Sequence, residues 1–418
     1  MDNAAGPAEI TISKSKRRLT LSAAVLGWLF DGLEMGLFPV IARPALQELL
    51  GLKGDQLVGI WMGRITAVFL FGASAGGVVF GWLGDRMGRV RAMSLSILTY
   101  SLFTGLCYFA HTPWHLAFFR FMAALGMGGE WSLGVALVME TWPSHARPWL
   151  ASVIGAAANV GFLLIAVITL ILPVGPHSWR WVMLVGAAPA LLTFFVRIFV
   201  PESERWRHAV ERIEVHPFRE IFRPPLVRPV LIAIILTSVI LMGTWASVQW
   251  IPLWIGRLTN GTAPHAMAMS QTIGALGAIC GCICGPLIAH AWGRRRSYFA
   301  LCALSLCSCE ALFLFVHHYG AVLLVAAFIV GFFTATFYGW LPLYLPELFP
   351  TRVRATAQGL SYNFGRIFAG IGALGAGNLV SHYGGDYAQM AARISLVYVV
   401  GMIAICFAPE SKGLVLPD

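Results

Sequence analysis

The first long apolar run of the chain, from Leu19 to about Ile41, contains two acidic residues, Asp31 and Glu34. A helix needs about 20 apolar residues to span a bilayer, so this run is long enough to cross one. A charged side chain at the centre of such a helix costs at least about 2.5–3.5 kcal/mol on insertion scales. The two acids are three positions apart and therefore share one helical face. We expect that face to meet a polar cavity or a cation, either for function or as a buried pair that fixes helix packing.

Charged residues are scarce throughout the chain. They make up 11% of its 418 residues, and hydrophobic residues make up 58%, whereas about 25% of a soluble protein is charged. The sequence therefore predicts an integral membrane protein. Its excess of Lys and Arg lies in short loops between apolar runs, which is typical of membrane topology rather than of nucleic-acid binding. The eight cysteines show no metal-site spacing and indicate no disulfide framework, so neither a metal nor another cofactor is expected.

Twelve apolar runs are long enough to be membrane spans. They lie near residues 19–42, 57–83, 91–110, 114–140, 148–172, 179–200, 229–253, 266–290, 297–316, 320–345, 354–380 and 388–408. A charged, proline-interrupted stretch at 201–228 separates the sixth run from the seventh. We therefore predict an all-α membrane protein with six-helix bundles at 1–200 and 229–418 and a cytoplasmic linker between them. The basic loops gather on one side, which places both termini in the cytoplasm of a multi-pass cell-membrane protein.

The two predicted bundles repeat one another in sequence. At an offset of 205 residues, Gly72, Gly76 and the Gly88-Arg89 pair match Gly277, Gly281 and Gly293-Arg294. The segment 140–147 also returns as 347–354. Concordant offsets favour two pseudo-symmetric halves, an arrangement found in secondary transporters whose substrate site lies between the halves at mid-membrane.

The loop between the second and third spans reads G-W-L-G-D-R-M-G-R-V-R over residues 81–91. It resembles the loop signature of the major facilitator superfamily. The resemblance implies that this loop latches one conformation through a charge contact with a neighbouring helix. Its copy at 289–296 lacks the acid, so only the first copy is expected to carry the switch. The residues that we expect to act in gating are Asp85, Arg86, Arg89, Glu140, Arg147, Glu347 and Arg354.

Three further segments resemble the superfamily branch that contains sialate, lactate and aromatic-acid proton symporters. They are the Asp31-Gly-Leu-Glu34 pair, the fourth span with its continuation to Arg147, and the eleventh span over residues 359–366. The resemblance covers nearly the whole chain and implies the twelve-helix major facilitator fold with proton-coupled transport.

The expected proton-coupling residues are Asp31, Glu34, Arg120 and Glu130. An acid that gains and loses a proton in apolar surroundings needs a nearby cation to balance the effect of burial. The resemblance pairs a first-span acid with the fourth-span arginine, so we expect Arg120 to be the partner of Asp31. Protonation of Asp31 would then release Arg120 and favour the other closure of the two halves. Alternatively, Arg120 is a purely structural ion-pair partner.

Arg366 lies in the eleventh span with no acid in the same helix. A buried guanidinium needs an anion, so we expect it to bind a substrate carboxylate through two hydrogen bonds, supported by Asn363 and Tyr362. Alternatively, it pairs with Glu310 or another acid across the bundle. Other side chains that could line the same cavity, or that only pack, are Asn159, Gln249, Trp245 and Tyr338.

Together these features predict a proton-coupled symporter that imports a small organic anion such as a monocarboxylate. Its expected partners are that anion, a proton and the lipid bilayer, and we expect a monomer that binds no nucleic acid. The 28-residue linker at 201–228 disfavours sialic acid, because sialate carriers of the branch can have extra central spans. Two alternatives remain: a proton-coupled exporter of hydrophobic compounds, and a transporter-like receptor without turnover. The sequence contains no catalytic motif and does not suggest an enzyme.

Overall fold

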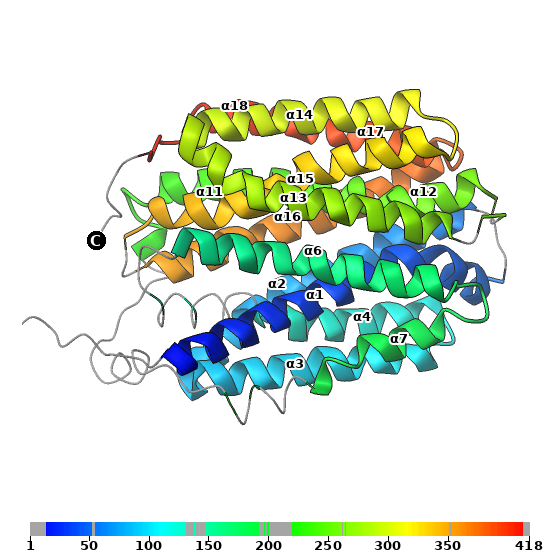
Figure 1. Ribbon diagram of the computed structural model, residues 1–418, viewed down its shortest axis with the longest axis horizontal. Helices are drawn as coiled ribbons and strands as arrows, with labels where there is room; N and C mark the ends of the chain where they lie inside the picture. Colours follow the sequence, from blue (N-terminus) through cyan, green and yellow to red (C-terminus); the bar gives the residue numbers. More distant parts are fainter. Residues whose placement is uncertain are drawn as a thin grey trace, which may run out of the picture.

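The computed structural model describes residues 14–51, 55–130, 138, 142, 147–191, 196, 199, 220–260, 262–263, 265–350 and 353–412. All regular elements in these ranges are helices (Figure 1). In the first half they are α1 (Lys14–Leu49), α2 (Asp55–Met87), α3 (Arg89–Leu106), η1 (Cys107–Phe109), α4 (Pro113–Met127), α6 (Arg147–Ile171) and α7 (Arg180–Gly186). In the second half they are α11 (Val227–Ala246), η3 (Val248–Trp250), α12 (Ile251–Leu258), α13 (Ala266–Trp292), α14 (Arg294–Phe315), α15 (Ala321–Glu347), α16 (Arg354–His382), α17 (Tyr387–Ser395) and α18 (Val397–Ile405).

Nine helical segments among the described residues are long and apolar enough to cross a membrane. They coincide with nine of the twelve predicted runs. The other three runs correspond to α4, α7 and α16. Helix α4 ends at Met127 and α7 at Gly186, and turns follow them at 128–129 and 187–189 before the described ranges break off after 130 and 191. Helix α16 has full length, but it is less apolar because it carries Arg366 together with glycine, serine and asparagine residues.

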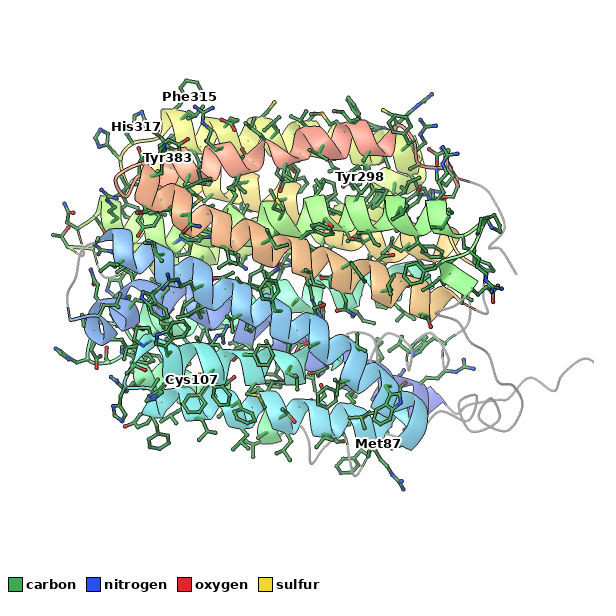
Figure 2. The ribbon with its side chains drawn as sticks, turned by 180° about the vertical axis from the view of Figure 1, so that it is seen from behind. Met87, Cys107, Tyr298, Phe315, His317 and Tyr383 are labelled. Carbon is green, nitrogen blue, oxygen red and sulfur yellow. The ribbon has the colours of Figure 1, made fainter. Side chains whose placement is uncertain are left out.

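The helices run side by side along one direction (Figure 1). Helices α1, α3, α4 and α7 lie at one side of the bundle, and α14, α17 and α18 lie at the other. Between them, α2 packs on α16 and α6 packs on α13, so these pairs join the two halves. The beginning of α1 and the end of α18 lie at the same end of the bundle. Met87 lies at one end of the molecule and His317 and Tyr383 at the other (Figure 2).

Apolar side chains both fill the interior and cover much of the outside. One buried apolar cluster runs through both halves. Phe315, Val322 and Ile171 are among the large apolar side chains left exposed on the helices. Such a surface is unfavourable in water and suits contact with lipid.

The sequence repeat corresponds to a repeated helix contact. Gly72 and Gly76 of α2 lie against the backbone oxygens of Phe121 and Leu125 in the fourth span. Gly277 and Gly281 of α13 lie in the same way against Phe328 and Phe332 of α15. A Cβ at any of these glycines would collide with that backbone. Because glycine has no side chain, α2 can approach the fourth span closely and α13 can approach α15 closely. The matched glycines therefore allow the same close helix contact in both halves.

The glycine turn repeats as well. Gly88 precedes α3 with φ 101° and Gly293 precedes α14 with φ 91°, a conformation that other residues rarely adopt. The side chains of Asp85, Arg86 and Arg89 lie outside the described part of the structure, so the predicted latch stays a prediction. Residues 201–219 also lie outside it, and the boundaries of the linker stay a prediction.

Candidate functional site

Five charged side chains meet in the buried interior of the bundle. None is more than 4% exposed to solvent. Two come from α1, one from α4, one from the segment just after α4 and one from α16. They are Asp31, Glu34, Arg120, Glu130 and Arg366, the same residues that the sequence marked for proton coupling and anion binding.

Arg120 forms an ion pair with Glu34: its Nη1 donates to Glu34 Oε1. The guanidinium also lies over the rings of Phe69, at 4.4 Å, and Phe38, at 5.5 Å, which adds cation–π attraction. The expected partner of Arg120 was Asp31, and the structure corrects this expectation. Glu34 lies three residues further along the same face of α1, and that position brings it to the arginine.

Asp31 faces Glu130 instead. The Glu130 carboxyl lies against Gly27 of α1, which is one helical turn before Asp31, so the two carboxyl groups adjoin. None of their four oxygen atoms has a hydrogen-bond partner among the described residues. Two adjoining carboxylates in apolar surroundings repel each other, and such a pair therefore favours holding one proton between them. The sequence named both residues but did not predict that they meet.

Arg366 reaches from α16 across to the other half. Its Nη1 donates to Asn363 Oδ1 at 3.2 Å, to the carbonyl oxygen of Ala73 at 3.3 Å and to that of Gly128 at 3.4 Å. Its guanidinium carbon lies 4.9 Å from the ring centre of Tyr362, and its charge acts on Asp31. Glu310, the alternative partner, accepts a hydrogen bond from Ser395 Oγ at 2.7 Å.

A cavity of about 150 Å³ lies between the two halves. It is lined by most of the expected side chains, namely Asn159, Gln249, Trp245, Tyr338 and Tyr362. Arg366 and Asn363 are not among its described lining residues, and no charged side chain is. This part of the interior is therefore neutral and rich in aromatic rings. The cavity and the charged cluster are therefore separate, whereas the sequence predicts that Arg366 and the cavity side chains form one site.

The cavity and the cluster nevertheless share two helices. Trp28 and Met35 line the cavity from α1, and Asp31 lies between them on the same helical face. On α16, Tyr362 lines the cavity and also lies beneath the Arg366 guanidinium. A change at Asp31 or Arg366 can therefore reach the cavity through directly neighbouring side chains.

The hydrogen bonds of the cavity wall fix several of these groups. Tyr338 Oη donates to Thr244 Oγ1 at 3.0 Å, and Asn159 Nδ2 donates to Cys282 Sγ at 3.3 Å.

Within the described ranges, no three His, Cys, Asp or Glu side chains gather as metal ligands would.

Gln271 is a cavity residue that the sequence reasoning missed. It lies on α13, and its Nε2 donates to Gly36 O of α1 at 3.0 Å and to Phe162 O of α6 at 3.5 Å. The side chain therefore ties the second half to two helices of the first. No motif surrounds it, and a single neutral amide in an apolar run gives little signal.

Of the expected gating residues, Glu347 can be described. It accepts hydrogen bonds from Arg294 Nε at 3.0 Å and Nη2 at 2.7 Å, and from Ser411 Oγ at 2.6 Å. It therefore holds the end of α15 to the start of α14. Glu140 and the side chains of Arg147 and Arg354 lie outside the described residues, and their gating role stays a prediction.

The sequence model of the Major Facilitator Superfamily matches residues 23–373 and, in a second match, 261–414. The chain belongs to this superfamily. In agreement, its fold is similar to that of a solved D-xylose–proton symporter, with a TM-score of 0.75 at 18% identity over 96% of this chain and 99% of that one. The predicted fold, all-α with twelve transmembrane helices in two pseudo-symmetric bundles, is confirmed.

Relatives of similar length point to transport. A Haemophilus influenzae protein named for metabolite transport is 30% identical over 94% of this chain and 96% of its own length. A Cupriavidus pinatubonensis protein named for 4-methylmuconolactone transport is 29% identical over 96% and 93%. A cis,cis-muconate transport protein of Acinetobacter baylyi is 29% identical over 93% and 94%. The chain is therefore a multi-pass membrane transporter and not an enzyme.

Proposed function

We propose that the protein is a proton-coupled symporter that imports a small organic anion, such as a monocarboxylate of about one ring in size. The observation that carries this proposal is the pair of buried carboxyl groups, Asp31 and Glu130, beside a neutral aromatic cavity between the two halves. A proton binds at the pair, the anion binds in the cavity, and together they permit the change to the inward-open state. Both termini lie in the cytoplasm, and the monomer is the working unit.

The size of the cavity supports a small substrate. An apolar cavity of about 150 Å³ is large enough to hold benzene, and the cavity here has this volume. The rings of Trp28, Phe162, Trp245, Tyr338 and Tyr362 suit a flat or unsaturated carbon skeleton. The unsaturated acids and lactones named for two relatives support the same class.

The absence of charge among the described lining residues suggests how the anion is held. Neutral donors such as Asn159 and Gln249 bind the carboxylate, and the proton at Asp31 and Glu130 compensates its charge. In this scheme Arg366 does not grip the substrate. It balances the charge of Asp31 and connects α16 to the backbone of the first half.

The test is transport by purified protein in liposomes, with benzoate, nicotinate and cis,cis-muconate as probes. With an inward proton gradient, at least one probe should accumulate above its outside concentration. Asp31→Asn should abolish this accumulation but retain exchange of labelled for unlabelled probe. Asp386→Asn is the matched control, because Asp386 caps α17 and Asn is an equally good cap. Uphill accumulation by Asp31→Asn at the wild-type level would remove Asp31 from the coupling role.

The neutral aromatic lining also suits a second function, proton-coupled export of hydrophobic compounds. The direction of transport separates the two. If the protein imports, a protonophore should lower the amount of probe inside cells, and if it exports, the protonophore should raise it.

A further inference from the structure

Helix α3 presents three hydroxyl groups to the charged cluster. Tyr100, Ser101 and Thr104 are fully buried, and none of their hydroxyl oxygens makes a hydrogen bond of normal geometry in the described part of the chain. Tyr100 and Thr104 are one helical turn apart, so they lie on one face. None of the three belongs to a motif that the sequence singled out.

The Tyr100 end of this face meets the carboxyl pair. The Tyr100 hydroxyl lies within electrostatic reach of Glu130, Asp31 and Glu34. The packing of α4 on α3 brings Glu130 towards it, because Gly126 lies directly against the backbone of Tyr100 and Glu130 follows Gly126 by four residues. Ser101 Oγ lies next to the Tyr100 hydroxyl.

The Thr104 end meets Glu34. Both side chains lie against Gly186 of α7, where a Cβ would be 3.4 Å from Glu34 Oε2 and 2.5 Å from Thr104 Cγ2. Glu34 uses its other oxygen, Oε1, for Arg120. The oxygen that faces Thr104 is therefore the one that the ion pair leaves without a partner.

Unpartnered polar atoms are concentrated in this one place. They are both carboxyl oxygens of Asp31 and of Glu130, Glu34 Oε2, the hydroxyls of Tyr100, Ser101 and Thr104, and Arg120 Nε. Buried polar groups in proteins are nearly always hydrogen-bonded, and a functional reason is one of the explanations for a group of exceptions. Proton transfer is such a reason, because hydroxyl groups can donate one proton while accepting another.

We propose that Tyr100, Ser101 and Thr104 carry a proton between the Asp31–Glu130 pair and Glu34, a relay that rests on the proposed proton coupling. A proton leaves the carboxyl pair for Tyr100 Oη, which passes its own proton to Ser101 Oγ. Ser101 passes its proton to Thr104 Oγ1, and Thr104 passes its proton to Glu34 Oε2. One proton has then left the pair and one has reached Glu34, and the hydroxyls are restored by rotation.

The relay gives proton binding a mechanical consequence. When Glu34 is protonated, it loses its charge attraction to Arg120. The two cations of the cluster, Arg120 and Arg366, lie on helices of different halves, so this release changes the charge balance across the interface. Proton binding at Asp31 and Glu130 is thereby connected to the Glu34–Arg120 ion pair, to which neither residue belongs.

The experiment follows the carboxyl groups directly and needs no substrate. The full chain in liposomes is given a rapid pH change, and the infrared bands of its protonated carboxyl groups are followed in time. Asp31→Asn and Glu130→Gln assign the bands of the carboxyl pair, and the shifted band of Glu34→Asp, which keeps a carboxylate for Arg120, assigns the Glu34 band. Tyr100→Phe should slow the Glu34 band about 100-fold, the lower end of what a positioned proton donor contributes, and leave the Asp31 band unchanged. Tyr298→Phe is the matched control, because Tyr298 is equally buried and donates to Leu236 O at 2.9 Å in the other half.

A second pair of variants covers the case in which Tyr100→Phe does not fold. Thr104→Val should slow the Glu34 band as well, and Thr104→Ser should restore its rate. If the Glu34 band keeps its wild-type rate in Tyr100→Phe or Thr104→Val, the relay is overturned and the hydroxyls are structural. If the wild type shows no Asp31 or Glu130 band at any pH, the proton site of the proposed function fails instead.

Discussion

Asp31 and Glu34 are the same chemical group on the same helical face, but they have different neighbours. Glu34 is bound to Arg120, which favours its charged form. Asp31 adjoins a second carboxyl group, which opposes a charge on both. Asp31 and Glu130 are therefore suited to take up a proton first, and Glu34 holds the cation until a proton reaches it.

Glu34→Gln should destabilise the protein strongly. It leaves Arg120 as a buried cation without its counter-ion, and the loss of one partner of a buried pair costs about 3–5 kcal/mol. Thermal denaturation of the purified protein measures the effect. Glu48→Gln is the control, because the Glu48–Arg180 pair is partly exposed and its loss should cost only about 1 kcal/mol. Equal losses in the two variants would contradict the argument.

At the scale of the helices, close contacts between backbones position the site. Gly32 of α1 lies against the carbonyl oxygen of Ala158 in α6, and Gly161 of α6 lies against that of Leu29 in α1. Because these contacts flank Asp31 on one helix and Asn159 on the other, they set the distance between the acid-bearing helix and the cavity wall.

Gly32→Ala should therefore disturb both stability and site. Its Cβ would overlap the Ala158 backbone, which cannot rotate away, and overpacking of this kind costs about 1–3 kcal/mol. Gly375→Ala in α16 is the control, since nothing lies within 4 Å of its Cβ position and Ala is the better helix residue by roughly 0.5–1 kcal/mol. We expect a lower melting temperature for the first variant and an equal or higher one for the second. A fall in both would show that the contact is not the cause.

The start of α14 should show a pH-dependent stability. Glu410 accepts hydrogen bonds from the backbone N–H groups of Arg294 at 2.9 Å, Arg295 at 3.1 Å and Lys412 at 3.0 Å. Partial burial raises the pKa of Glu410, but these hydrogen bonds to its charged form outweigh that effect and hold the pKa below its usual value of 4.5. The stabilisation is therefore present above pH 4.5 and is lost as the pH falls through the lowered pKa.

Glu410→Gln tests this sign. Denaturant unfolding should show a less stable variant at neutral pH, and the difference from wild type should shrink in acid. A difference that stays constant or grows with acidity would contradict the assigned role of the carboxylate.

At the scale of the whole molecule, side chains from one half bind the backbone of the other. Gln271 of α13 reaches Gly36 and Phe162, and Arg366 of α16 reaches Ala73 and Gly128. Alternating access requires such contacts to form in one conformation and break in another. They therefore set the population of the conformation described here.

Gln271→Leu should lower that population. Removing the amide eliminates two hydrogen bonds between the halves while keeping a similar volume. At a net 0.5–1.5 kcal/mol per bond, the loss of both corresponds to roughly 5- to 150-fold in the population. Distances between spin labels at the ends of α6 and α13 measure the two populations. Thr272→Val on the same helix is the control, because its hydroxyl bonds within α13, to Ala268 O at 2.8 Å. An unchanged distance distribution in Gln271→Leu would exclude this contact as a determinant.

The helical membrane fold and its repeat could be predicted from local features of the sequence. The length of an apolar run and the spacing of glycines are local properties, and they act in the same way whichever helix packs alongside. The matched glycines at 72, 76, 277 and 281 therefore predicted two repeated halves, and the structure places them in equivalent helix contacts. The buried charges could also be named, because an acid or arginine in an apolar run is conspicuous and costly.

Which of these charges meet could not be predicted from the sequence and is seen in the packed helices. Glu34 rather than Asp31 binds Arg120, and Glu130 adjoins Asp31. Arg366 donates to backbone oxygens and is not among the described residues that line the cavity. Partner choice depends on how each helix is rotated and where it crosses its neighbours. The side chains of Asp31 and Glu34 differ in direction around α1 by only a fraction of a turn. Which neighbour each one meets is therefore set by how helices distant in the sequence pack against α1.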